Sequence, residues 1–551
     1  MQFNLKKILF ITGISLAAIL LVGFLLIYVF LPYKVTSVIK KEITQSLHDE
    51  QTTNYYIVEV SKVKFNRFFQ QLHIPDIYVA LDPQVFLDSL YESMPKNYIT
   101  ISLENINIST PGLVNLARKK DNVKLTQFSI ERVKAITYQN PEGTKPDNDK
   151  EKDKEKNNEL PENISIENFN IQYINLESRL LSDTSQILHF ISDANIAGDI
   201  YINSPPNDSI PQIEVTDYTV NAKKLQFQQG LYRYSLDSLI LDDTSKNIQL
   251  SQFRMEALYS REEFSRHITY QTDHMDVSVN SLEIQGFELN PLINKQFFNS
   301  TEIIINEGIV KVYRDRNLPF NTSQRPALPT KLIREAPYQF NIDKTTIKNL
   351  DILYSELPEG GTNTGDVPFR NLQASIENIT NISEQLQKDS MMHINANANS
   401  FDNSSLNASF HYNLNDINGG FRANVELSNF DFRKLNSVLD PLVGIEIDKG
   451  IHRKSTLTFS GNDFHSSGTL IMLYSDLDIT LEPERSDFRQ NVVGWAARNF
   501  LYFSANPSNN NEPRKGKIDF ERDPSRFVFH YWWNSYLSGI KNTILRENIN
   551  L

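Results

Sequence analysis

The chain is dominated by a repeated alternation of apolar and polar residues, and this pattern limits the folds open to it. From about Asn54 onward, apolar side chains recur at every second position in one short segment after another. A period of two is typical of strands that carry one apolar and one polar face. Because no long helical pattern separates the segments, we predict a mostly β fold in an antiparallel meander rather than βαβ units.

Within this pattern one unit recurs, in which two alternating apolar residues precede a short polar break and the alternation then resumes. The segment ISIENFNIQY shows it with Ile164, Ile166, Phe169 and Ile171. The same unit recurs in the segments 277–289, 303–313 and 340–354. The breaks contain Asn, Asp, Glu, Lys and Gly, which are the residues that form tight turns or bulges.

A long series of one-faced strands must bury its apolar face against something. A second sheet would give closed β-sandwiches, whereas a sheet curled into an elongated groove could take lipid acyl chains. Periodicity alone leaves both alternatives open. The residues predicted to line such a groove are Ile166, Ile171, Ile284, Leu289, Ile305, Val312, Ile342, Ile352, Leu427, Leu470, Leu477 and Ile479.

The N-terminus carries an apolar run from Ile8 to Leu31 that is long enough to span a bilayer as a helix. We predict an uncleaved signal-anchor, with Ile8, Leu16, Leu20, Phe24 and Leu31 among the residues of the anchor. A cleaved signal peptide is the alternative, but the run lacks small residues at its exit. The lysines before the run favour a cytoplasmic N-terminus, which places the bulk of the chain across the membrane.

Shifts in composition divide the chain into five predicted regions. Residues 1–34 form a short tail and the anchor, and residues 35–139 a β-rich region with two short helices, near 85–91 and 113–117. A charged stretch at 140–162 is predicted to be a disordered loop. Residues 163–399 form the repetitive β region. Residues 400–551 form a C-terminal β region with capping helices over 487–501 and 533–544.

The sequence contains no recognisable catalytic, metal or cofactor motif. Cysteine is absent, which excludes disulfides, thiolate metal sites and a cysteine nucleophile. The ten histidines are scattered, with no close pair along the chain, and no glycine-rich phosphate loop or nucleophile elbow occurs. The net charge of −12 and the lack of a basic stripe argue against nucleic-acid binding. We therefore predict no enzyme activity, no cofactor and no metal.

The C-terminal third resembles the AsmA-like family of bacterial envelope proteins, which is related to the bridge-like lipid-transfer proteins of the TamB and YdbH type. The resemblance lies in the segment from Phe430 to Pro441, the glycine-bounded turn from Gly444 to Gly450, and the strands from Gly468 to Ile479. The anchor, the charged insertion and the final segments FSANP and FERDPSRFVFHYWW are similar to the layout of that family. Residues 400–551 carry most of the similarity.

This resemblance implies a single-pass protein of the bacterial inner membrane with a periplasmic β-groove. It implies that phospholipids are the ligands and that the protein supports lipid transport or outer-membrane biogenesis, with an outer-membrane or envelope protein as a further partner at the C-terminal end. It brings no catalytic residues. The alternative is an envelope scaffold with closed β-sandwich domains that bind protein partners. A weaker third hypothesis is an extracytoplasmic hydrolase without a recognisable motif.

Overall fold

The computed structural model describes residues 31–46, 56–66, 68–82, 97–111, 122–139, 162–204, 211–481, 502–508 and 512–545. The anchor residues Ile8, Leu16, Leu20 and Phe24 lie outside these ranges, and Leu31 is the first residue of a helix. The predicted short helices near 85–91, 113–117 and 487–501 and nearly all of the charged stretch at 140–162 also lie outside them. Within the described part, no helix combines the length and apolar character needed to cross a membrane.

Strands dominate the described residues, which confirms the mostly β prediction, and the chain divides into two compact units. The first unit comprises residues 1–227 and 238–245, and the second comprises residues 228–237 and 246–551. The division therefore falls near the end of β9 and within β10. The five regions predicted from composition remain predictions.

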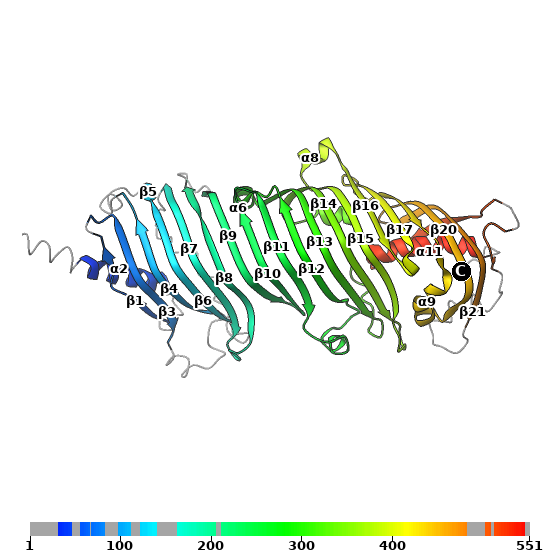
Figure 1. The fold of residues 1–551 in the computed structure, drawn as a ribbon, viewed down its shortest axis with the longest axis horizontal. Coiled ribbons are helices and arrows are strands. Elements are labelled where there is room, and N and C mark those ends of the chain that lie inside the picture. Colours follow the sequence, from blue (N-terminus) through cyan, green and yellow to red (C-terminus); the bar gives the residue numbers. More distant parts are fainter. Residues whose placement is uncertain are drawn as a thin grey trace, which may run out of the picture. The chain divides into compact units, whose positions relative to one another are not determined.

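The described residues of the first unit form one helix and a series of strands (Figure 1). Its elements are α2 (Leu31–Ser46), β1 (Tyr56–Val60), β2 (Lys64–Phe65), β3 (Gln71–Leu81), β4 (Asn97–Ser109), β5 (Asn122–Leu125), β6 (Gln127–Gln139), β7 (Asn163–Leu180), β8 (Ile187–Asn203) and β9 (Gln212–Gln229), with β10 (Tyr232–Asp242) shared between the units.

The second unit contains longer strands interrupted by short helices. Its elements are β11 (Asn247–Ala257), α5 (Arg261–Phe264), η4 (Ser265–His267), β12 (His274–Gln285), α6 (Leu289–Lys295), β13 (Phe297–Asp315), α7 (Pro329–Arg334), β14 (Gln339–Leu357), β15 (Gly365–Thr380), α8 (Ser383–Lys388), β16 (Met391–Asn399), η5 (Phe401–Asn403), β17 (Ser405–Asn413), β18 (Phe421–Leu427), β19 (Phe430–Asp431), η6 (Phe432–Leu435), α9 (Asn436–Val443), β20 (Ile445–Gly461), β21 (His465–Leu481), β22 (Lys515–Glu521) and α11 (Val528–Ile544).

The sheet of each unit is open and mixed, so the prediction of a purely antiparallel meander is wrong. Most neighbouring strands are antiparallel, but β5 and β6 run parallel to β7 in the first unit, and β13 runs parallel to β14 in the second. A parallel pair requires a long crossover between its strands. The charged stretch at 140–162 joins β6 to β7, and residues 316–338, which include α7, join β13 to β14. These two long connections are the physical reason for the change of direction.

The polar breaks of the repeated sequence unit include both outcomes that were predicted. The break at Asn168 lies inside β7, where the register shifts as in a bulge, and the break at 306–308 lies inside β13, whereas Gly286 turns the chain out of the sheet after β12. Asn168 in β7, Glu307 in β13 and Asn349 in β14 have positive φ values of 50°, 53° and 53°. Asn and Asp tolerate this left-handed conformation better than most residues. Each of these three breaks keeps the strand continuous while it reverses the alternation, which explains why β13 and β14 both reach 19 residues.

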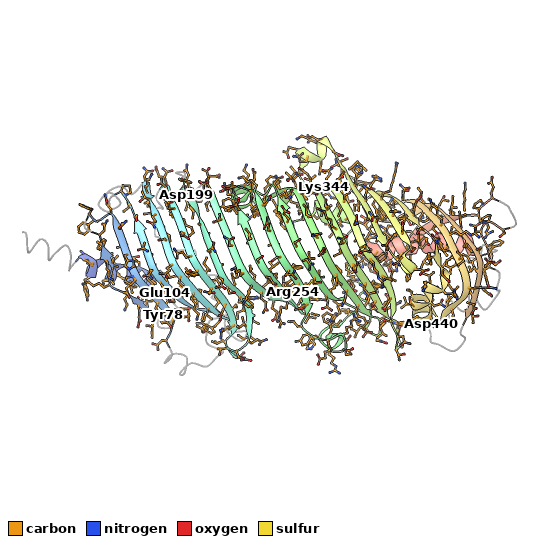
Figure 2. The ribbon with its side chains drawn as sticks, viewed as in Figure 1. Tyr78, Glu104, Asp199, Arg254, Lys344 and Asp440 are labelled. Atoms are coloured by element: carbon orange, nitrogen blue, oxygen red, sulfur yellow. The ribbon has the colours of Figure 1, made fainter. Side chains whose placement is uncertain are left out.

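In four cases a side chain on the neighbouring strand, or directly after it, accepts a hydrogen bond from the backbone N–H of the residue with positive φ. Asp199 Oδ1 accepts from Asn168 N at 2.8 Å, and Asp351 Oδ1 accepts from Asn371 N at 2.8 Å. Asn175 and Asp243 do the same for Asp193 and Asp217. Figure 2 labels Asp199, one of these acceptors. A break of this kind bends the strand and increases its twist.

Each unit has one end at which a helix packs on the apolar face of the sheet. In the first unit, Val35, Ile39 and Ile43 of α2 pack against a core that includes Ile74 and Ile106. In the second unit, α11, which Figure 1 draws in red, contacts β21 and β22. Its core contains Phe410, Leu457, Leu470, Met472 and Ile518. We call the part of the second unit that surrounds this core the covered end.

The helix expected over residues 533–544 is part of α11, and Ile540 and Ile544 pack against the core of this unit. The buried residues of α11 are Tyr531, Ser535, Gly539 and Thr543, whereas Trp533 is 52% exposed. A Cβ atom on Gly539 would lie only 2.9 Å from Leu470 Cβ. Small residues thus allow the helix to approach the sheet closely.

Candidate functional site

The second unit carries a continuous apolar surface on one face of strands β11 to β15. Residues directly opposite each other on paired strands point to the same face, so the register defines five cross-strand rows. The rows, which we call the open rows, are Ile248–Ile284–Ile303–Thr345–Ile376, Leu250–Leu282–Ile305–Ile347–Ala374, Phe253–Val279–Gly308–Leu350–Leu372, Met255–Val277–Val310–Ile352–Phe369 and Met275–Val312–Tyr354–Val367.

Backbone breaks keep these rows on one face. Positive φ values occur between the second and the third row at Gln252, Glu307 and Asn349, and between the third and the fourth row at Asn371. On the remaining strand the same level is occupied by Asn280, whose Nδ2 donates to Glu307 Oε2 at 2.8 Å. Ile305 and Val310 can therefore share a face even though one has an odd and the other an even number.

The described helices and strands cover the open rows less completely than they cover the core of the covered end. Their side chains are half-buried, apart from Val279, Thr345 and Leu350, which are buried. No residue of β11 to β14 belongs to a buried apolar cluster of the described chain. Ile376 on β15 is the margin, because it packs against the core of the covered end.

Charged residues form the next row beyond Tyr354. Arg314 donates two hydrogen bonds to the Asp273 carboxylate, from Nε at 2.7 Å and from Nη2 at 2.8 Å. Glu356 accepts hydrogen bonds from Tyr354 at 2.7 Å and from Arg316 at 3.0 Å. Burial and the neighbouring Glu356 raise the pKa of the Tyr354 hydroxyl, so it remains a proton donor. The apolar surface thus ends at a band of paired charges.

The opposite face of the same strands is polar. Lys344 pairs with Glu302 at 3.4 Å, and Arg254 pairs with Asp237 at 3.1 Å; Figure 2 labels both basic residues. Ile309 lies on this polar face, because its chain neighbours Gly308 and Val310 belong to the open rows on the other face. Its side chain is 46% exposed. The sheet of this unit therefore has two chemically different sides.

The first unit has similar apolar rows of its own. One row runs Ile74–Ile106–Ile130–Ile171–Ile196–Val220, and another runs Val79–Ile101–Ala135–Leu176–Ile191–Leu225. The rows begin within the core beneath α2 and extend to β9, and Leu176 on β7 is 36% exposed. The apolar pattern is therefore common to both units.

The structure separates the predicted groove residues into three groups. Ile284, Ile305, Val312 and Ile352 belong to the open rows, and Ile342 lies opposite Ile379, at the margin of the covered end. Ile166 and Ile171 lie on β7 of the first unit.

The third group lies at the covered end. Leu470 and Leu477 are buried, at 0% and 4% exposure, and Leu427 and Ile479 pack against the same core. These four side chains already have protein partners.

Leu289 departs from the predicted strand pattern. β12 ends at Gln285, and Leu289 is the first residue of α6. Gly286 has a φ of 67°, which turns the chain out of the sheet before Pro291 favours the first turn of a helix. Apolar residues continue to alternate through Phe287 in the sequence, so the two-residue period alone does not predict that β12 ends at Gln285.

A close histidine pair is present, which corrects the prediction of scattered histidines. The Nδ1 atoms of His393 on β16 and His411 on β17 lie 2.7 Å apart. The two residues are 18 positions apart in the sequence, so only the pairing of their strands brings them together. Within the described ranges, no three His, Cys, Asp or Glu residues gather in a way that could hold a metal ion.

Comparison with models of protein families and with curated proteins finds no match to this chain. The resemblance to AsmA-like proteins therefore remains a prediction.

Proposed function

We propose that this chain binds phospholipid acyl chains along its apolar sheet faces and thereby supports lipid transport or outer-membrane biogenesis in a bacterial envelope. The single observation that carries the proposal is the set of five open rows in the second unit. They form a surface of aliphatic and aromatic side chains that lacks the helix found at the covered end.

The energetics favour an apolar ligand on this surface. Each CH₂ group removed from water contributes about 0.8 kcal/mol, so an acyl chain of ordinary length offsets the cost of its own ordering. A soluble protein seldom leaves so large an apolar surface without a partner. The polar opposite face and the charged row at Arg314 would limit the ligand to one side of the sheet.

The backbone breaks support a curved sheet. Bulges bend strands and increase twist, and here the breaks lie side by side on neighbouring strands. We infer that the sheet curls around its apolar face to form the groove. The predicted anchor from Ile8 to Leu31 would attach the protein to the inner membrane, with the described residues in the periplasm.

The scaffold alternative predicted closed β-sandwiches, whereas the described strands form open sheets. No observation specifically favours a scaffold function, and the lipid experiment below distinguishes the two. The proposal includes no catalytic step.

The test uses two substitutions on one strand, with the full chain purified in mild detergent. Ile305→Asp places a carboxylate in an open row, and Ile309→Asp places one on the opposite face of β13. Mass spectrometry of the co-purifying lipids is expected to find phospholipid with the wild type and with Ile309→Asp, and much less with Ile305→Asp. Circular dichroism checks that each variant remains folded. A folded wild type without lipid, or equal lipid in both variants, would contradict the proposal.

A further inference from the structure

His393 and His411 face each other directly across the β16–β17 pair, on the side of the sheet away from the core of the covered end. Phe410 and Tyr412, the sequence neighbours of His411, are both buried in that core. The two imidazole rings meet at 78°, with their centroids 4.9 Å apart. Both side chains are half-buried, so small ions in solvent can reach them.

The 2.7 Å separation of the two Nδ1 atoms fixes their protonation. One Nδ1 must carry a proton and donate it, while the other accepts with its lone pair. Two Nδ1–H groups would oppose each other at this distance. The pair therefore presents two convergent nitrogen ligands that are bridged by a single proton. A metal ion can take the place of that proton when the donor ring shifts its hydrogen to Nε2.

We propose that His393 and His411 form a two-histidine site for a divalent transition-metal ion such as Zn²⁺. Imidazole nitrogen is a preferred ligand of zinc, copper and nickel, whereas calcium and magnesium prefer oxygen. With zinc–nitrogen bonds of about 2.0–2.1 Å in a tetrahedral arrangement, the two nitrogens would lie roughly 3.3 Å apart. A small rotation of either ring can move the two nitrogen atoms apart by the few tenths of an ångström that this requires. Water molecules complete the coordination.

The flanking charges modulate the site from both sides. Glu377 on β15 is the strand partner of His393, and Arg422 on β18 is the strand partner of His411. The carboxylate favours a cation and the guanidinium opposes it. β16 and β17 carry no other charged residue. With two protein ligands, the site binds more weakly than a closed structural zinc site, which has four.

A bound ion would connect the two strands at the edge of the covered end. Because it binds the paired strands and not the unfolded chain, it stabilises the folded state by mass action. A metal ion binds only an unprotonated ring nitrogen, so acid competes with the ion and weakens binding. The site is independent of lipid binding, because its side chains lie on the opposite face.

The test is a Zn²⁺ titration of the tag-free full chain after EDTA treatment and dialysis, at pH 7.5 and pH 5.5. Isothermal titration calorimetry gives the affinity, and the thermal unfolding temperature gives the stabilisation. His393→Ala and His411→Gln each remove one ligand. His73→Ala is the matched control, because His73 also lies in a strand but has Asn107 as its ring partner, at 2.9 Å. Mg²⁺ is the control ion.

We expect Zn²⁺ to bind the wild type and the His73→Ala variant at pH 7.5 and to raise their unfolding temperatures. Either ligand variant should lose tenfold or more in affinity, in line with the effect of a weakened metal environment. Binding should decline at pH 5.5, and Mg²⁺ should have no effect. The proposal is overturned if the wild type binds no Zn²⁺, or if the folded ligand variants bind it as tightly as the wild type.

Discussion

The open rows and the covered end of the second unit have the same sequence pattern but different degrees of burial. In β21 and β22, Leu470 and Ile518 are completely buried, whereas Leu282 and Ile305 in the open rows remain half-buried. The strands do not account for this difference, since both regions place apolar residues on one face. The difference in burial arises because α11, near the C-terminus, packs on β21 and β22 at the covered end. The comparison shows that alternation marks an apolar face without indicating what will occupy it.

The residues of α11 that face the sheet are shaped to fit the covered end. Ser535, Gly539 and Thr543 provide a small-residue surface that fits against Leu470 and Ile518. Gly516 is equally close, because a Cβ atom there would lie 2.1 Å from the carbonyl oxygen of Gly539. The covered end is thus specifically shaped for one protein partner, whereas the open rows consist mainly of aliphatic and aromatic side chains that suit a flexible one.

The largest effect is expected from Leu470→Ala at the covered end. Removing a fully buried leucine side chain leaves a cavity beneath α11 and should cost about 2–5 kcal/mol of the free energy of unfolding. Urea unfolding followed by tryptophan fluorescence measures it, because two of the three tryptophans lie in α11. A cost below about 1 kcal/mol would mean that the covered end is less tightly packed than its exposed areas indicate.

Acidification is expected to weaken the covered end next. His452 is 1% exposed, with ring nitrogens 2.9 Å from Ser428 O and 2.7 Å from Ser455 Oγ, and burial lowers its pKa to about 4. The unfolded chain therefore binds a proton more readily than the folded chain. Stability is fully present above about pH 6.5 and falls as the pH drops from 6.5 to 4, by at most about 3 kcal/mol.

Measuring the free energy of unfolding at several pH values checks this expectation. His452→Gln removes the titrating ring, so its unfolding free energy should depend less on pH over the same interval. If both proteins lose equal stability, other groups are responsible for the acid sensitivity.

A smaller effect is expected at a backbone break beside the open rows. Asp351→Ala removes the acceptor that holds Asn371 N–H at 2.8 Å and should cost about 1 kcal/mol. Asp351→Asn retains an acceptor oxygen and should restore most of the stability. Hydrogen exchange of the Asn371 amide is the direct measurement, and equal protection in all three proteins would show that the side chain does not hold this break.

The smallest effect on stability is expected from Leu282→Ala in an open row, which is the counterpart of Leu470→Ala. The Leu282 side chain is already partly exposed to solvent, so the loss in free energy of unfolding should stay below about 1 kcal/mol. Lipid retention should nevertheless decrease, because the substitution removes apolar contact area. A cost equal to that of Leu470→Ala would abolish the distinction between the two regions.

Sequence reasoning recovered the strands and their apolar positions but not the strand directions. Ile284, Ile305, Val312 and Ile352 were predicted to share an apolar face, and they do. The prediction placed Leu470 and Leu477 in the same group, although they are buried at the covered end. Alternation depends on local backbone geometry, while burial depends on distant segments such as α11.

The histidine pair illustrates the same limit. Histidines 18 residues apart look unrelated in the sequence, and the register between β16 and β17 alone makes them neighbours. The polar breaks were more informative. Asn168 and Glu307 lie in interruptions of the period that the sequence shows, but a turn and a mid-strand break use the same residue types. Only the continuation of hydrogen bonding on both sides distinguishes them.

The sequence by itself determined that this protein is built from long strands with one apolar and one polar side, because side-chain direction follows from the two-residue period of an extended backbone. It also determined where that period is interrupted. The tertiary structure decided which strands run parallel, which part of the apolar face receives a helix, and which histidines meet. These properties depend on contacts between residues far apart in the chain, and the free energy of such contacts is not encoded in any single segment.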